Sequence, residues 1–90
     1  MARSGSSSAA ALRDKTGRTY VAIPVASDGF EIDALLSVLV VAKASQITGI
    51  EAIVIAGDKP DLSSQAVIAS EDATAKLFMV DSVGLLLALN

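Results

Sequence analysis

The segment Ile50–Ala56, with the sequence IEAIVIA, constrains the fold of this chain more than any other feature. Every position except Glu51 is aliphatic, and a glycine stands on each side of the segment. A strand that is apolar almost without interruption is typical of the centre of a sheet, with both of its faces covered. The segment therefore predicts a central strand in a sheet layered with helices.

Two segments predict the helices of that layered fold. The longer runs from about Phe30 to Gln46. Asp28–Gly29 interrupts the regular structure before it, and Thr48–Gly49 terminates it. Its aliphatic residues occupy nearly the whole circumference, which indicates a helix buried on more than one side and the more buried of the two. The shorter helix is predicted over about Leu62–Ser70, after a loop whose proline suits a first helical turn.

The N-terminal part of the chain predicts a β-hairpin. Ala9–Arg13 and Thr19–Ala26 have extended character, and the Asp and Gly of Asp14–Arg18 between them favour a turn. Pro24 cannot donate a ladder hydrogen bond, so the second strand is expected at a sheet edge or to bulge there.

The C-terminal part adds two strands, Lys76–Val80 and Leu85–Leu89, around a turn at Asp81–Gly84. The resulting order, ββαβαββ, predicts a three-layer α/β/α domain whose mixed sheet starts with an antiparallel hairpin. One domain is expected over residues 8–90, preceded by a flexible, small and polar tail at residues 1–7.

The composition excludes most of the common enzyme chemistries. The 90 residues include no cysteine and no histidine, so thiolate nucleophiles, imidazole bases, disulfides and Cys/His zinc sites are impossible. Aromatic residues make up 3% of the chain and its net charge is −3, which argues against base stacking and phosphate contacts. No nucleic-acid partner is therefore expected.

Aliphatic residues are unusually abundant for so short a chain. Hydrophobic residues account for 52% of it, and a domain of this size leaves a large part of its surface exposed. We therefore expect a homo-oligomer, a dimer or a tetramer, that covers some of this apolar area. The longest apolar run, Ala34–Ala42, is interrupted by Ser37 and is about half the roughly 20 residues of a membrane-spanning helix. No membrane contact and a cytoplasmic location are therefore expected.

Several stretches of the chain resemble the cytidine deaminase superfamily. Ala9–Tyr20 is similar to the family's first hairpin, and Ser27–Phe30 to the lead-in to its first metal-binding helix. Ile50–Ala56 resembles the central strand, Pro60–Ile68 the second metal-binding helix, and Lys76–Gly84 the strand and turn that follow. The likeness covers about residues 8–89, lacks the family's usual leading helix and implies the family's fold.

The same resemblance implies that the family's chemistry is missing. Those enzymes bind zinc through one His or Cys on the first helix and two Cys on the second, and a Glu moves the protons. Asp33 and Leu35 stand where the first ligand and the Glu would be, and Asp61 and Ser64 replace the two thiolates. Ile23–Ala26 likewise offers no polar side chain where the family contacts the ribose. The resemblance thus implies a degenerate member without the zinc site.

The four residues Asp33, Leu35, Asp61 and Ser64 remain the candidate ligand-binding set, as the lining of a remnant pocket. Two carboxylates and a hydroxyl could hold a hard cation such as Mg²⁺ or Ca²⁺, but they are few ligands. Both aspartates lie at predicted helix starts, where carboxylates commonly cap the helix, and capping is the favoured interpretation. No catalytic residue, metal or cofactor is predicted.

Three functions follow as hypotheses. The leading one is a catalytically inactive cytidine-deaminase-like protein that acts as an oligomeric binding or scaffolding module for a protein partner. The alternative is a small-molecule binding protein that holds a nucleoside or another polar ligand in the remnant pocket. The third denies the resemblance and leaves an unrelated open α/β domain of unknown role.

Overall fold

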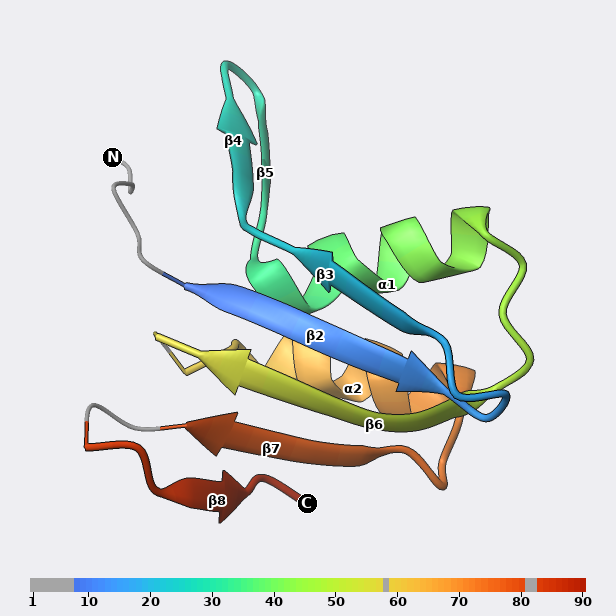
Figure 1. The fold of residues 1–90 in the computed structure, drawn as a ribbon. Coiled ribbons are helices and arrows are strands. Elements are labelled where there is room, and N and C mark those ends of the chain that lie inside the picture. Colours follow the sequence, from blue (N-terminus) through green and yellow to red (C-terminus); the bar gives the residue numbers. More distant parts are fainter. Residues whose placement is uncertain (1–7, 58, 81–82) are drawn as a thin grey trace.

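The computed structural model describes residues 8–57, 59–80 and 83–90, and Figure 1 shows a five-stranded sheet with two helices behind it. The sheet order is β3-β2-β6-β7-β8, so the aliphatic segment at its third position is the central strand, as predicted. A separate two-stranded sheet is formed by β4 and β5. The elements are β2 (Ala9–Asp14), β3 (Thr19–Ala22), β4 (Val25–Ser27), β5 (Phe30–Ile32), α1 (Ala34–Ala44), β6 (Ile50–Ala56), α2 (Leu62–Glu71), β7 (Lys76–Val80) and β8 (Leu86–Ala88).

The sheet is mixed and begins with the predicted antiparallel hairpin. β2 pairs antiparallel with β3 on one side and with β6 on the other, whereas β6 and β7 run parallel and β8 returns antiparallel to β7. The hairpin turn is held by Asp14, whose Oδ1 accepts hydrogen bonds from the backbone N–H of Thr16 and Arg18 and from the Thr16 hydroxyl. The mixed α/β class is thus confirmed.

The segment before α1 differs from its prediction. Phe30–Ile32 is not the first turn of the helix but strand β5, and Asp28–Gly29 is the turn of a second hairpin. The expected second strand, Thr19–Ala26, accordingly ends at Ala22, and the chain leaves the main sheet at Pro24, which cannot donate a ladder hydrogen bond. The apolar residues at positions 30 and 32 fit either a helix or a strand, which explains why the helix was predicted to start too early.

The core lies between the helices and one face of the sheet. Six of the 11 residues of α1 are buried against two of ten in α2, so α1 is the more buried helix, as predicted. Leu12, Ile53 and Leu35 have no exposed surface and occupy the centre of this layer. Burying one such side chain contributes roughly 1.5–3 kcal/mol to stability.

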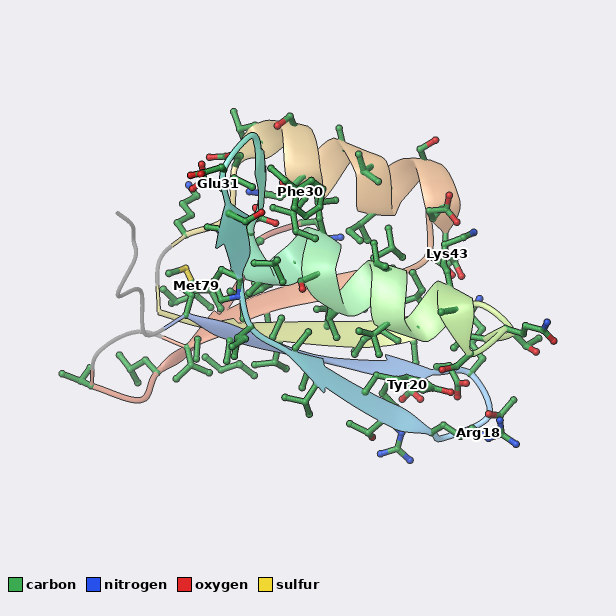
Figure 2. All side chains as sticks on the ribbon, turned by 90° about the horizontal axis from the view of Figure 1, so that it is seen from above. Arg18, Tyr20, Phe30, Glu31, Lys43 and Met79 are labelled. Atoms are coloured by element: carbon green, nitrogen blue, oxygen red, sulfur yellow. The ribbon has the colours of Figure 1, made fainter. Side chains whose placement is uncertain are left out.

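Both helices lie on the same face of the sheet (Figures 1 and 2), so the described residues form two layers and not the expected three. The strand β6 is aliphatic on both faces, but Ala52 and Val54 on its second face are only half-buried and no described helix covers them. The register of the sheet places ten apolar residues on this uncovered surface, here named the open sheet face: Ala9, Ala11, Val21, Ala52, Val54, Ala56, Phe78, Val80, Leu86 and Ala88.

Other boundaries agree closely with the sequence. Lys76–Val80 is a strand over its full predicted length, and β8 and α2 each lie within two residues of their predicted ends. The predicted flexible tail at residues 1–7, and Asp81 and Ser82 of the predicted turn, lie outside the described residues. None of the helices in the described ranges is long and apolar enough to cross a membrane.

Candidate functional site: a carboxylate-lined cavity

A cavity of about 360 Å³ opens where the start of α1, the end of β6 and the start of α2 meet. Three of the four predicted site residues line it, namely Asp33, Leu35 and Asp61. The fourth, Ser64, is buried within α2 and is not part of the lining. A volume in this range is typical of small-ligand sites, which occupy about 300–1,000 Å³.

Asp33 is the best-defined polar group of the cavity. It caps α1, because its Oδ1 accepts a hydrogen bond of 2.9 Å from the backbone N–H of Leu36. Its other oxygen, Oδ2, is buried and has no hydrogen-bond partner. The capping role foreseen from the sequence accounts for one carboxylate oxygen, and the second is left available to a donor.

Asp61 occupies the corresponding position at the start of α2, but its side chain makes no capping hydrogen bond. Its backbone carbonyl accepts from Gln65 N–H, so the helix begins normally without the carboxylate. Asp61 is exposed and lines the cavity. Its carboxylate therefore contributes negative charge there.

Leu35 separates the cavity from the core. It has no exposed surface and belongs to the same apolar cluster as Leu12 and Ile53. An aliphatic side chain neither donates nor accepts a proton, so this position gives the cavity an apolar floor without acid–base chemistry.

Two charged residues of the cavity were missed by sequence reasoning. Glu31 comes from β5 and Lys59 from the loop before α2, and both line the cavity. Each stands two residues before a predicted site residue, Glu31 before Asp33 and Lys59 before Asp61, and this closeness in the sequence could have pointed to both. The described lining thus carries three carboxylates and one ammonium group, a net negative charge. Within the described ranges, no group of three or more His, Cys, Asp or Glu side chains is arranged to hold a metal ion.

A second cavity of about 290 Å³ lies at the other end of α1. Its charged groups already have partners: the Lys43 Nζ is 2.6 Å from the Glu71 Oε1, and Asp72 accepts from the backbone N–H groups of Ile50 and Thr74 and from the Thr74 hydroxyl. These hydrogen bonds, led by the one from the Thr74 hydroxyl, hold the pKa of Asp72 well below its usual range. The Asp72 carboxylate therefore ties the start of β6 to the start of β7 and serves the fold.

Figure 2 shows how the side chains near the first cavity are arranged: Phe30 and Glu31 project to opposite sides of the β4–β5 hairpin. This agrees with the register, in which Ser27 faces Phe30 and Ala26 faces Glu31. Glu31 lines the cavity together with its neighbour Ile32.

Comparisons with known proteins address the fold and the family. A family model described as "Cytidine deaminase-like" matches residues 1–84. Among solved structures, the crystal structure of cytidine deaminase from Mycobacterium leprae superimposes with a TM-score of 0.74 at 12% sequence identity, over 98% of this chain and 78% of that one. A search of curated proteins finds no match to this chain.

Proposed function

This chain belongs to the cytidine deaminase-like family, and from that premise we propose that it is a member without deaminase chemistry that acts as an oligomeric binding or scaffolding module. The observation that carries the proposal is the chemistry of the cavity. By its resemblance to the family, the chain has Asp33, Asp61 and Ser64 at the positions of the zinc ligands. It has Leu35 at the position of the glutamate that carries protons.

These residues do not fit the zinc site of a deaminase. The chain has no His or Cys to supply nitrogen or sulfur ligands. Asp33 already uses one oxygen to cap α1, and Ser64 does not line the cavity. Leu35 is packed in the core and cannot move a proton. The proposal is therefore that both the metal-bound nucleophile and the acid–base group are missing.

Zinc content tests this half of the proposal. We expect protein purified in the presence of zinc, and then desalted, to contain far less than one zinc ion per chain by elemental analysis. One zinc ion retained per chain would contradict it. The result is independent of any partner, since it depends only on the ligands of the chain.

The open sheet face supports the oligomeric half of the proposal. Its two edges carry Val21, 66% exposed on β3, and Leu86, 57% exposed on β8, with Val54 and Phe78 half-buried between them. An apolar face of this kind on one side of a sheet is typical of a contact surface. We propose that a second copy of the chain covers it.

Sedimentation velocity at micromolar concentration tests the oligomer. We expect a dimer or larger for the wild type and a monomer for the double variant Val21→Lys/Leu86→Lys, because four charges would then face an apolar contact in a dimer. Val40→Lys is the matched control, since Val40 is 59% exposed on α1, away from that face. A wild-type monomer, or a control that dissociates as readily as the double variant, would overturn the assignment of this face.

A second candidate function, the binding of a nucleoside-type small molecule, is favoured by one observation. The Asp33 Oδ2 is buried and unpartnered beside a cavity large enough for a small ligand. Cytidine at millimolar concentration would then raise the melting temperature, by an amount that grows with the ratio of its concentration to its Kd. A cytoplasmic location remains part of the main proposal and is tested by cell fractionation.

A further inference from the structure

The β4–β5 hairpin, here named the arm, extends away from the main sheet (Figure 1). Val25–Ser27 pairs only with Phe30–Ile32, so within the described chain each strand of the arm keeps one unpaired edge. An isolated two-stranded hairpin is marginally stable in water, and a third strand would stabilise it. Unpaired strand edges are also where extended peptides add to a sheet.

The two faces of the arm differ in chemistry. Val25, Ser27, Phe30 and Ile32 share one face, on which Phe30 is 53% exposed, whereas Ala26 and Glu31 share the other. A strand added to either edge would place alternate side chains on these faces. The arm therefore suits a segment in which apolar and polar residues alternate.

The charge of the cavity lining indicates the charge of the partner segment. Glu31 on the arm, Asp33 at its end and Asp61 across the cavity are opposed only by Lys59 among the described lining residues. The buried Asp33 Oδ2 has no donor, and an unsatisfied charged acceptor is costly. A cationic side chain with N–H donors would supply both the missing charge and the missing hydrogen bond.

We propose that the arm and the cavity at its base bind an extended, positively charged peptide segment of a partner protein. The segment adds to the arm as a third strand and inserts a Lys or Arg side chain into the cavity, where an N–H donates to Asp33 Oδ2. A second copy of this chain is a poorer occupant, because its arm carries the same Glu31 and Asp33 and would meet like charge. The inference rests on the proposed binding role and names the class of partner.

Fluorescence anisotropy with defined peptides tests this proposal. The probe is a fluorescein-labelled peptide with the sequence Val-Arg-Val-Arg-Val-Arg, and the control replaces each Arg with Gln. We expect the Arg peptide to bind at least tenfold more tightly than the Gln peptide and to weaken at 0.5 M salt. N-methylation of alternate peptide groups, which blocks strand addition along one edge of the peptide, should also reduce its affinity when it is placed on the pairing side.

Matched variants locate the binding. Asp33→Asn keeps the N-cap, since Asn caps as well as Asp, and removes the charge. We expect it to weaken the Arg peptide about tenfold or more, the effect of losing one hydrogen bond to a charged group, with little change in melting temperature. Glu51→Gln is the control: it removes the same charge from β6, where Glu51 contacts Arg13 at 3.4 Å and does not line the cavity.

Equal loss of affinity in both variants, or equal affinity for the Arg and Gln peptides, would overturn the inference. Cytidine binding without Arg-peptide binding would also overturn it, in favour of the small-molecule function. Failure of the peptide leaves the zinc measurement untouched, so the two proposals can be judged separately.

Discussion

Substitution Leu35→Glu returns a carboxylate to the position where the family resemblance expects one, and the structure predicts that it destabilises the protein. Leu35 has no exposed surface and packs in the core cluster. Losing its buried apolar contribution costs about 1.5–3 kcal/mol, and burying an unpartnered polar group adds about 1–3 kcal/mol. The expected loss of about 2.5–6 kcal/mol compares with a total stability of roughly 5–13 kcal/mol for a chain of this length.

The loss should also depend on pH. Burial disfavours the charged form, so the introduced carboxyl would have a pKa above the ordinary value of about 4.3. Between that value and the raised pKa, the folded state holds a proton that the unfolded state has released, and stability falls as pH rises. The penalty is therefore smallest near pH 4 and grows towards pH 8.

Urea unfolding followed by far-UV circular dichroism, at several pH values, measures both effects. Leu35→Met is the control, because this swap conserves volume and should cost less than about 1.5 kcal/mol. A Leu35→Glu variant that is as stable as the wild type at pH 8 would refute the reasoning, since it would show that the position is solvated from the cavity and not part of the core.

Three further predictions concern stability. Asp33→Ala should lower stability by about 1 kcal/mol through loss of the α1 cap, whereas Asp33→Asn should change it by a few tenths at most, as measured by thermal unfolding; equal losses would contradict the capping role. Hydrogen bonds, mainly from the Thr16 hydroxyl to Asp14 and from the Thr74 hydroxyl to Asp72, lower the pKa of each carboxyl, so each carboxylate stabilises the fold above about pH 4 and loses this effect as the pH falls below it. Asp14→Asn and Asp72→Asn should therefore make the free energy of unfolding fall less steeply at acidic pH, and an unchanged pH dependence would argue against this role. Gly57→Ala should cost more than about 1 kcal/mol in urea unfolding, because Gly57 has φ +98° and an added Cβ would lie 2.6 Å from the Ser8 Cα; a neutral result would show that the end of β6 readily shifts.

The sequence predicted those elements whose character depends on their own residues. β6 is almost wholly aliphatic and lies between two glycines, and β7 is mostly apolar and is followed by Asp81 and Ser82, so their limits were found without knowledge of the fold. The arm was missed because Phe30 and Ile32 extend the apolar pattern of α1 backwards. The Asp33 cap is a local signal that could have moved the helix start to Ala34.

The cavity was predictable only in part. Asp33, Leu35 and Asp61 were brought together by the family resemblance, and the structure places all three on its lining. Glu31 and Lys59 were missed, although each stands two residues before a predicted site residue, Asp33 or Asp61, and lines the cavity with it. The open sheet face was missed because an aliphatic strand gives the same pattern whether its second face meets a helix or solvent. Packing between distant segments brings the starts of α1 and α2 together at the cavity and leaves the open sheet face uncovered within the described residues. Local sequence patterns do not show such packing.

Ammonia release from cytidine and deoxycytidine, assayed with and without added zinc, tests the central claim most directly. We expect no release above a heat-inactivated control under either condition, because the chain has no His or Cys to hold a deaminase zinc and Leu35 occupies the proposed proton-carrier position. Zinc-dependent ammonia release above that control would contradict the account and make this member of the family an enzyme.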